Sequence, residues 1–380
     1  MKVLHINTER TWRGGEQQVL SLLRGLAAGG VAQELLCQPG SALAARARDT
    51  GAAVWERPLR GELDVGAALA IARRCRQQRP DVIHMHTSHA HTLGVLGARL
   101  AGRARPATVV SRRVDFSIHK RRLLDFSGFK YSRGVDRILC VSEMIRRVLV
   151  ADGVPPALLG VVHSGIELQR LENVPDRSVE YRREFGIPAA APVVGNVGHC
   201  AEHKGQRHLI AAAPAVLARH PEARFLIVGE GELLPALKAQ AAGLGIADRV
   251  LFPGFRTDVP ALLRLFDVFC FPSVQEGLGT SVLDALAMRR PVVASSAGGI
   301  PEMIEHGVHG LLVPPGDAPA LSAALLEMLE NPVRARALGE AGRARVEQEF
   351  SAERMVAGTL AEYERLLASR AAAAPAVGAR

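Results

Sequence analysis

A chain of 380 residues exceeds the length of one ordinary domain, and its 48% hydrophobic and 22% charged residues exclude a largely disordered protein. Aromatic residues make up only 4% of the chain, which argues against a stacking surface for nucleic acid, and no apolar run approaches the roughly 20 residues of a membrane-spanning helix. The net charge of +9 is concentrated in segment 99–147, with 13 Lys and Arg against 4 Asp and Glu, which is either a binding surface for an anionic partner or an ordinary solvated face.

Short apolar runs alternate with segments of helical period from the first residue to about residue 315. This is the pattern of βα units that wind into parallel sheets, so we expect an α/β fold. The first helix is expected at 16–28, where Val19, Leu22, Leu23 and Leu26 share one face. The strands predicted in this half are 3–7, 34–38, 53–56, 82–85, 108–111, 137–141 and 160–162.

A polar stretch from residue 163 to 192 interrupts the pattern and is expected to connect two domains, with the boundary near residue 168. A second βα series follows, with predicted strands at 193–197, 225–228, 250–252, 268–271, 292–294 and 311–313. Only helices are predicted after residue 318, and the last carries Met355, Leu360, Tyr363 and Leu367 at near-helical spacing. The predicted parts are an N-terminal domain 1–168, a C-terminal domain 169–350, a helix 351–371 that packs back on the N-terminal domain, and a disordered tail 372–380.

The start of the chain and its cysteines bear on where the protein resides. Residues 2–7 form a strand rather than the apolar core of a signal peptide, so we expect a cytoplasmic protein. The cysteines are odd in number, scattered and without CxxC spacing, which favours reduced, buried thiols over a disulfide framework or a zinc site. They are Cys37, Cys75, Cys140, Cys200 and Cys270.

Ligands of open parallel sheets bind beyond the carboxyl ends of the strands, and two such domains facing each other would form a cleft. In the first of these loops, Gly14 and Gly15 precede a helix and could bring backbone N–H groups to a phosphate, although a plain tight turn explains them equally well. That loop lacks the GxGxxG pattern, and Gly229-Glu230-Gly231 has Leu234 where the third glycine belongs. A nicotinamide dinucleotide site is therefore disfavoured, and no P-loop occurs.

The most informative stretch is 271–317, FPSVQEGLGTSVLDALAMRRPVVASSAGGIPEMIEHGVHGLLVPPGD, together with HCAEHKGQ around Lys204. It resembles the retaining glycosyltransferases of family 4, whose signature is a glutamate, a glycine-rich turn and a second acid eight residues later. The resemblance covers nearly the whole chain and is strongest over 193–317. It implies the GT-B fold, in which two Rossmann-like domains face each other across a cleft, the first binding the acceptor and the second a nucleoside diphosphate sugar.

The resemblance also implies roles for residues of the signature. Glu276 would accept hydrogen bonds from donor-sugar hydroxyls, and the backbone N–H groups of Gly277, Leu278, Gly279 and Thr280 would cradle the sugar and diphosphate at a helix N-terminus. Asp284 stands where the family usually has the glutamate that binds both ribose hydroxyls, and it reaches one methylene less far.

Other donor-side residues follow from the same resemblance. Lys204 matches the lysine that pairs with the diphosphate and stabilises charge on the departing nucleotide. His199 stands where the family tends to have an arginine, and Arg112 or Arg113 could supply the missing charge. Gly254, Phe255 and Arg256 resemble the segment whose backbone contacts the nucleobase, and Gly298-Gly299 resembles a turn that shapes the donor pocket, although glycines after strands are common as turn formers.

In the first half, His84, His86, His89 and His91 fall within eight residues, a density that raises the possibility of a metal. The family commonly has histidines at this strand end without a metal, and the chain contains no DxD triplet, so we expect no metal cofactor. The next strand ends in Arg112, Arg113 and Asp115, which could bind a phosphate and position the acceptor hydroxyl, or could form a surface ion pair of little energetic value.

These observations predict a glycosyltransferase that moves a sugar from a nucleoside diphosphate sugar to a hydroxyl acceptor, with retention implied by the resemblance. The basic segment 99–147 suits a lipopolysaccharide core, a lipid-linked saccharide or another anionic glycan at the inner face of the cytoplasmic membrane, where the protein would bind peripherally. A nucleic-acid partner is not expected. The alternatives are a sugar-nucleotide epimerase of the same fold and a non-catalytic nucleotide-sugar-binding module.

Overall fold

The structure is a computed structural model that describes residues 1–118, 131 and 134–373, and it divides into two compact units. Unit 1 comprises Met1–Gly165 together with the C-terminal segment that begins at Ala352, and unit 2 comprises Ile166–Ser351. The chain thus passes from one unit to the other after Gly165 and after Ser351, beside the predicted boundaries at residues 168 and 350.

The strands of unit 1 form one parallel sheet, which has seven members among the described residues, in the order β3-β2-β1-β4-β5-β6-β7. Its central strands are largely apolar because helices cover both faces of the sheet, and Val3, Leu4 and Ile6 of β1 are at most 1% exposed. The strands are β1 Lys2–Ile6, β2 Ala32–Cys37, β3 Ala53–Glu56, β4 Val82–Met85, β5 Ala107–Arg112, β6 Arg137–Cys140 and β7 Leu159–Val161.

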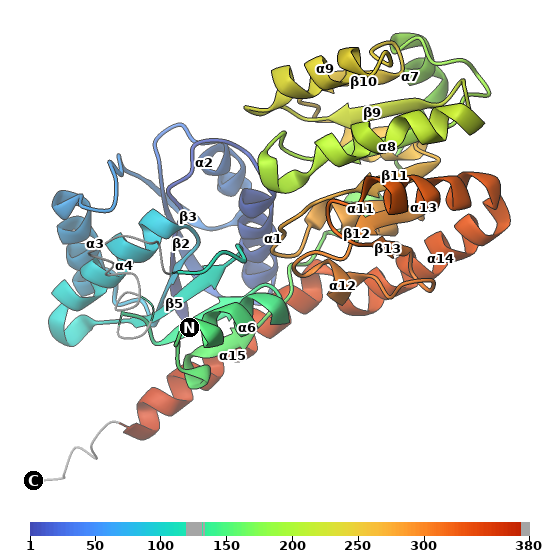
Figure 1. Cartoon of the computed structure of the whole chain (residues 1–380). Helices are drawn as coiled ribbons and strands as arrows, with labels where there is room; N and C mark the ends of the chain where they lie inside the picture. Colours follow the sequence, from blue (N-terminus) through green and yellow to red (C-terminus); the bar gives the residue numbers. More distant parts are fainter. Residues whose placement is uncertain (119–130, 132–133, 374–380) are drawn as a thin grey trace, which may run out of the picture. The chain divides into compact units, whose positions relative to one another are not determined.

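The helices of unit 1 are α1 Gly14–Ala28, α2 Ala42–Ala47, α3 Val65–Gln78, α4 Ser88–Leu100, α6 Glu143–Ala151 and α15 Ala352–Ala373, with 3-10 turns η1 Arg48–Thr50, η2 Gly102–Ala104 and η3 Pro156–Leu158. Helix α1 buries the face predicted for it. Helix α15, red in Figure 1, is last in the chain yet lies with the blue and green elements of unit 1. Its Met355 and Tyr363 pack in one apolar cluster with Val3, Leu22 and Leu26.

Unit 2 repeats the layered plan, with six parallel strands among the residues described, in the order β10-β9-β8-β11-β12-β13. The strands are β8 Val193–Val197, β9 Arg224–Val228, β10 Val250–Gly254, β11 Val268–Phe271, β12 Val292–Ser295 and β13 Leu311–Val313. The helices are α7 Ser178–Glu184, α8 Gln206–Arg219, α9 Leu234–Gly243, α10 Val259–Leu265, α11 Thr280–Ala287, α12 Ile300–Met303, α13 Ala318–Glu330 and α14 Pro332–Glu349, with 3-10 turns η4 Leu168–Leu171 and η5 Glu202–Lys204. The α/β class and the parallel sheets are as predicted.

Each sheet has one point where the order of strands reverses direction. In unit 1 this point lies between β1 and β4, and in unit 2 it lies between β8 and β11. The loops that leave two such strands diverge at the carboxyl edge and leave room for a ligand. These two places are therefore the expected ligand-binding edges of the two sheets.

Helix length, the cysteines and the ends of the described ranges bear on predictions made from the sequence. Across the described part of the chain, no helix is both long enough and apolar enough to span a membrane. All five cysteines are buried and unpaired, as predicted. Residues 119–130 and 132–133 of the basic segment lie outside the described residues, as does the predicted disordered tail beyond Ala373, where α15 ends two residues later than expected.

Candidate functional site

The reversal point of unit 2 brings together the loop after β8, which runs from Gly198 to Gly205, and the loop after β11, which begins at Pro272. The two loops are joined through their backbones, since the N–H groups of Val274 and Gln275 donate to the carbonyl oxygen of His203 at 2.9 and 3.3 Å. The start of segment 271–317 and the segment around Lys204 therefore lie side by side.

Two glycines allow this close approach. Gly205 has φ +65°, and a Cβ there would lie 2.1 Å from the carbonyl oxygen of Pro272. Gly298 has φ +54°, and a Cβ there would lie 1.7 Å from the carbonyl oxygen of Glu276, which also accepts a hydrogen bond from the N–H of Gly299 at 3.1 Å. The Glu276 loop is thus held by the β8 loop on one side and by the 298–299 turn on the other.

Lys204 and Glu276, two residues predicted to act in catalysis, are in direct contact. The Lys204 Nζ donates to Glu276 Oε2 at 2.5 Å, and the two side chains are only 19% and 12% exposed. The ammonium also lies 5.3 Å from the ring centroid of Phe271, and the Ser273 hydroxyl donates to the same carboxylate oxygen at 3.4 Å. This sheltered ion pair places a cation and a carboxylate at the carboxyl edge of the central strands.

The helix that follows, α11, starts at Thr280 without a side-chain cap. Gly279 precedes it with φ +96°, and Gly277, Leu278 and Gly279 are all buried. The first N–H groups of a helix lack partners within the helix and carry the positive end of its dipole, so such a terminus favours an anion. Together with the Lys204 ammonium, the start of α11 makes this edge of unit 2 suitable for a phosphate group.

Asp284 lies one turn into α11 and is not free. Arg170 of η4 forms an ion pair with it through Nη2 and Oδ1, and the two side chains are 28% and 16% exposed. Burial raises the pKa of the Asp284 carboxyl, and the Arg170 charge opposes that rise. Nothing in the sequence pattern singled out Arg170, because only the fold brings it to a partner 114 residues away.

His199 occupies a more open position in the loop after β8. Its Nε2 lies 3.2 Å from the Glu232 carboxylate, and the two side chains are 37% and 65% exposed. The carboxylate of Glu232 is therefore the neighbour of this imidazole. An arginine at this position would be permanently charged, whereas the histidine carries a charge only when protonated.

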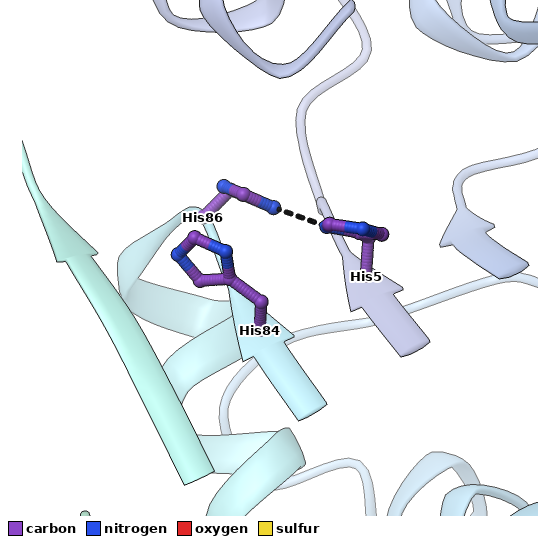
Figure 2. A group of neighbouring side chains, drawn as sticks. All are labelled: His5, His84 and His86. Atoms are coloured by element: carbon purple, nitrogen blue, oxygen red, sulfur yellow. Dashed lines mark hydrogen bonds between the residues drawn. The ribbon is translucent and has the colours of Figure 1, made fainter. Parts of the chain in front are cut away.

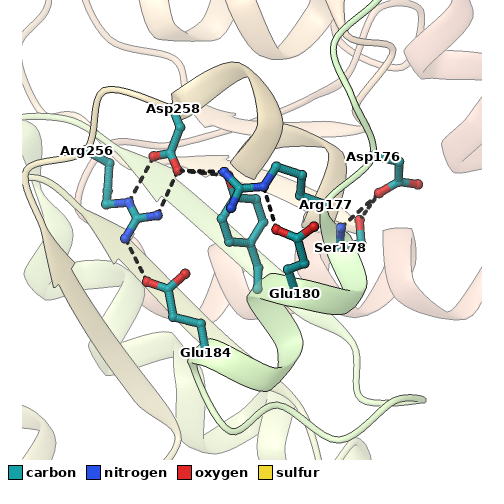
Figure 3. A network of polar contacts seen from close by, with 8 residues as sticks. Asp176, Arg177, Ser178, Glu180, Glu184, Arg256 and Asp258 are labelled. Atoms are coloured by element: carbon teal, nitrogen blue, oxygen red, sulfur yellow. Dashed lines mark hydrogen bonds and ion pairs between the residues drawn. The ribbon is translucent and has the colours of Figure 1, made fainter.

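The loop after β10 is fixed by a polar network, shown in Figure 3. Arg256 donates to both carboxylate oxygens of Asp258 at 2.9 and 2.7 Å and to Glu184 of α7 at 2.7 Å, while the Tyr181 hydroxyl donates to Asp258 at 2.8 Å. Arg256 lowers the pKa of Asp258 to about 2. The Arg256 side chain thus ties its loop to α7.

Two neighbours of Arg256 remain available for a ligand. Gly254 ends β10 with φ +75°, and the Phe255 residue is 56% exposed. An exposed aromatic ring beyond a strand end is suited to stacking. In this segment, then, the backbone and Phe255 are the parts that can meet a base.

In unit 1, Gly14 and Gly15 open α1, and the carboxylate of Glu16 closes over its start. The N–H of Arg13 donates to Glu16 Oε2 at 3.1 Å and the Asn7 amide donates to Oε1 at 3.3 Å. Burial raises the pKa of the Glu16 carboxyl. The Glu16 side chain therefore places a carboxyl group of the protein at the N-terminus of α1.

A cluster of buried histidines occupies the reversal point of unit 1 (Figure 2). His5 Nδ1 and His86 Nε2 hydrogen-bond each other at 3.0 Å, while His84 lies between the hydroxyls of Tyr363 and Ser111 at 2.5 and 2.8 Å. Burial lowers the pKa of His5 to about 3 and the pKa values of the other two well below their usual range, so all three are neutral at pH 7.

This cluster differs from the one that the sequence suggested. His84 and His86 are joined by His5 from the neighbouring strand β1, whereas His89 is exposed on α4 and His91 packs against Tyr131. One ligand atom from each of the three clustered rings lies within 4.8 Å of the others, close enough for a shared metal.

Hydrogen bonding and charge argue against a cation among these rings. The Arg113 guanidinium donates to the His86 carbonyl at 2.9 Å and lies 3.4 Å from its Nδ1. Its positive charge next to the cluster repels a metal ion. The rings are therefore better suited to a hydrogen-bonded core than to metal binding.

The two arginines after β5 have separate surroundings. Arg112 donates to the Tyr131 hydroxyl at 2.9 Å and to the Phe116 carbonyl at 2.5 Å, so it braces its own loop. Arg113 instead lines, with His84 and Ser111, a cavity of about 20 Å³ in unit 1, which has room for about one water molecule. Burial lowers the pKa of Arg113 to about 10. Asp115 lies further along the loop and is partly buried. Of the predicted acceptor-side residues, Arg113 and His84 are the ones that line this small cavity.

Family models and individual known proteins both show that the chain is similar to glycosyltransferases. The family model described as Glycosyltransferase Family 4 matches residues 12–170, and the model described as Glycosyl transferases group 1 matches residues 191–331. The 2-deoxystreptamine glucosyltransferase of Streptomyces kanamyceticus is 30% identical over 324 residues, which cover 80% of this chain and 82% of that protein.

Two further proteins extend the comparison. A GDP-mannose-dependent monoacylated alpha-(1-6)-phosphatidylinositol monomannoside mannosyltransferase of Corynebacterium glutamicum is 34% identical over 237 residues, 60% of this chain and 61% of that protein. The crystal structure of Anabaena HepE in complex with UDP and glucose covers 96% of this chain and 99% of its own, with a TM-score of 0.83 and 22% identity. Because the sequence identity is only 22%, this structural similarity is evidence for a shared fold alone.

Proposed function

The chain belongs to glycosyltransferase family 4 and its two α/β units have the GT-B fold, and from this premise we propose that it transfers a hexose from a nucleoside diphosphate sugar to a hydroxyl acceptor with retention of configuration. The observation that carries the proposal is the sheltered contact between Lys204 and Glu276 beside the uncapped start of α11. A cation and a helix N-terminus suit a diphosphate, and a carboxylate suits sugar hydroxyls.

The donor site would act mainly through charge and orientation. When donor binds, Lys204 and the N–H groups at Gly279 and Thr280 stabilise the diphosphate, and Glu276 accepts hydrogen bonds from hydroxyls of the transferred sugar. His199 donates a further hydrogen bond to the departing phosphate. The bond between the anomeric carbon and the phosphate oxygen breaks, the bond to the acceptor oxygen forms on the same face, and the acceptor proton passes to the departing phosphate.

No metal cofactor is part of this proposal. Lys204 and the start of α11 together provide positive charge for the diphosphate. The histidine cluster of unit 1 lies beside the Arg113 guanidinium, a poor environment for a cation. The base of the nucleotide would be met by Phe255 and by the backbone at Gly254.

Unit 1 carries the residues that we assign to the acceptor: His84, His86, Arg113 and Asp115, with Arg112 bracing their loop. Gly14 and Gly15 at the start of α1 stay assigned to a phosphate of the donor. The proposed acceptor is a cell-surface glycan, such as a lipopolysaccharide core or a lipid-linked saccharide. The charge of segment 99–147 supports an anionic acceptor at the inner face of the cytoplasmic membrane. The Corynebacterium relative is named for a glycolipid acceptor, whereas the Streptomyces relative is named for an aminocyclitol.

Calorimetric titration with UDP, GDP and ADP sugars tests the donor assignment. We expect one nucleotide sugar to bind the native chain, and Lys204→Ala to weaken that binding strongly. Turnover of the donor alone into an isomer, without an acceptor, would show an epimerase instead. Binding without transfer to any glycan acceptor, or no binding across the panel, would contradict the transferase assignment.

A further inference from the structure

Both acids of segment 276–284 have a counter-cation from a distant part of unit 2. Glu276 pairs with Lys204, and Asp284 pairs with Arg170. The first pair is already part of the proposed donor site. The second pair has no role so far, although it lies on the same helix.

Arg170 has a hydrogen-bond donor to spare. A guanidinium can give two parallel N–H groups to one carboxylate, but Arg170 contacts Asp284 through Nη2 alone. Its Nε is buried, and no acceptor among the described residues reaches it. A buried N–H without a partner costs free energy, so an oxygen atom supplied by a ligand would be favourable here.

The position of the pair identifies the ligand group that it would meet. Asp284 follows Thr280 by four residues and therefore lies on the same face of α11, about 6 Å further along its axis. If the diphosphate binds at the start of α11, the group about one turn away is the sugar attached to it on the nucleoside side. That sugar is ribose, with two neighbouring hydroxyl groups.

A hydroxyl group both donates and accepts a hydrogen bond. The carboxylate of Asp284 can accept from a ribose hydroxyl, and the spare Nε of Arg170 can donate to a hydroxyl oxygen. We propose that Arg170 is a ribose-binding residue that completes, with Asp284, a subsite for the vicinal hydroxyls of the nucleotide. This inference rests on the proposed function, because it takes the donor to be a nucleoside diphosphate sugar.

Arg170 also maintains the chemical state that the subsite requires. Burial raises the pKa of the Asp284 carboxyl, and the Arg170 charge is the force that lowers it again. An ionised Asp284 accepts hydrogen bonds through both oxygens, whereas a protonated one gives up part of that capacity. The arginine thus compensates for an aspartate that reaches less far than a glutamate would.

The test compares a nucleoside diphosphate with its 2′-deoxy and 3′-deoxy forms, using the base that binds the native chain. We expect the native chain to bind the ribose form about tenfold more tightly than the weaker deoxy form. In Arg170→Met this preference should fall to about twofold or less, because methionine has a similar length but no donor to the hydroxyl. Arg170→Lys keeps the charge but removes the Nε donor, so it should also lose most of the preference.

Two variants serve as controls. Lys204→Ala should weaken all the nucleotides by the same factor and leave the ratio between ribose and deoxy forms unchanged. Arg219→Gln removes an arginine of the same unit that pairs with Glu330 at 2.9 Å, so it should change neither affinity nor ratio. Thermal unfolding of each variant establishes that it is folded. If Arg170→Met does not fold, Arg170→Lys remains as the deciding variant.

The outcomes separate this inference from the proposed function. Nucleotide binding with an unchanged ribose preference in both Arg170 variants, or no preference in the native chain, overturns the role of Arg170 but leaves the transferase intact. Failure of every nucleoside diphosphate to bind the native chain overturns both.

Discussion

Lys204 and Glu276 are 72 residues apart in the chain, and their side chains meet at 2.5 Å in the only part of unit 2 where the order of its described strands reverses. The contact joins two loops that leave neighbouring strands. Because both side chains are largely sheltered from solvent, replacing either one leaves the other charge without its partner.

Replacing Lys204 by alanine should lower kcat by about 10²- to 10³-fold, because the charge on the departing diphosphate loses its cation. Steady-state transfer from the identified donor measures the effect. The matched control is Lys238→Ala, which removes a lysine whose Nζ lies 5.9 Å from the Phe252 ring. A kcat within about twofold of native in Lys204→Ala would rule out this role for the ammonium.

Alanine at Gly298 should disrupt the donor loop, since the new Cβ would lie 1.7 Å from the Glu276 carbonyl oxygen. We expect loss of nucleotide-sugar binding and a lower Tm. Gly307→Ala is the matched control, because Gly307 also has a positive φ but has no atom within 4 Å of the added Cβ. That control should lose only about 1–2 kcal/mol from backbone strain and keep its affinity. Equal losses of affinity and Tm in the two variants would show that backbone strain, and not the contact with Glu276, causes the effect of Gly298→Ala.

Removal of divalent metal should leave activity unchanged, since the proposed site counters the diphosphate charge with Lys204 and the start of α11. The assay is sugar transfer after dialysis against EDTA, with and without added Mg²⁺, Mn²⁺ or Zn²⁺. Activity that disappears with EDTA and returns with one of these ions would contradict the metal-free proposal and direct attention to the histidine cluster.

Peripheral membrane binding should depend on the basic segment and on salt. Sedimentation with vesicles containing anionic lipid should show binding that weakens steeply as salt rises. Changing Arg103 and Arg147 of that segment to glutamate should reduce binding, whereas the same changes at Arg219 and Arg289 of unit 2 should not. Binding insensitive to salt, or equal in both double variants, would count against the basic segment as the contact.

The network around Asp258 should make stability depend on acid. Arg256 lowers the folded-state pKa of Asp258 from 3.8 to about 2, so its contribution is complete above the unfolded value and is lost as pH falls from about 4 to 2. Because the site is partly exposed, solvent screening reduces the contribution of this ion pair to the free energy of unfolding to about 1 kcal/mol. Urea unfolding should show Asp258→Asn less stable than native by that amount at pH 7, with the difference shrinking towards pH 2. A difference independent of pH would mean that packing, not charge, carries the effect.

The inner strands were predictable because most are short, largely apolar runs buried on both faces, as Val268–Phe271 illustrates. Glu276 and Lys204 were singled out by the resemblance of the segments around them to the family signature. Arg170 was not, because an ion pair over 114 residues leaves no local trace. His5 was not associated with His84 and His86 for the same reason: it joins them through the pairing of β1 with β4, which spacing along the chain does not reveal.

Helix α15 has a consequence for how the chain matures. Met355 and Tyr363 belong to the same apolar cluster as Val3 and Leu22, so the interior of unit 1 contains both the first and nearly the last described residues of the chain. Unit 2, by contrast, is continuous from Ile166 to Ser351. During synthesis, the part of unit 1 before Gly165 must therefore wait with an unfilled interior until α15 has left the ribosome, while unit 2, which lies between them in the chain, can finish folding earlier.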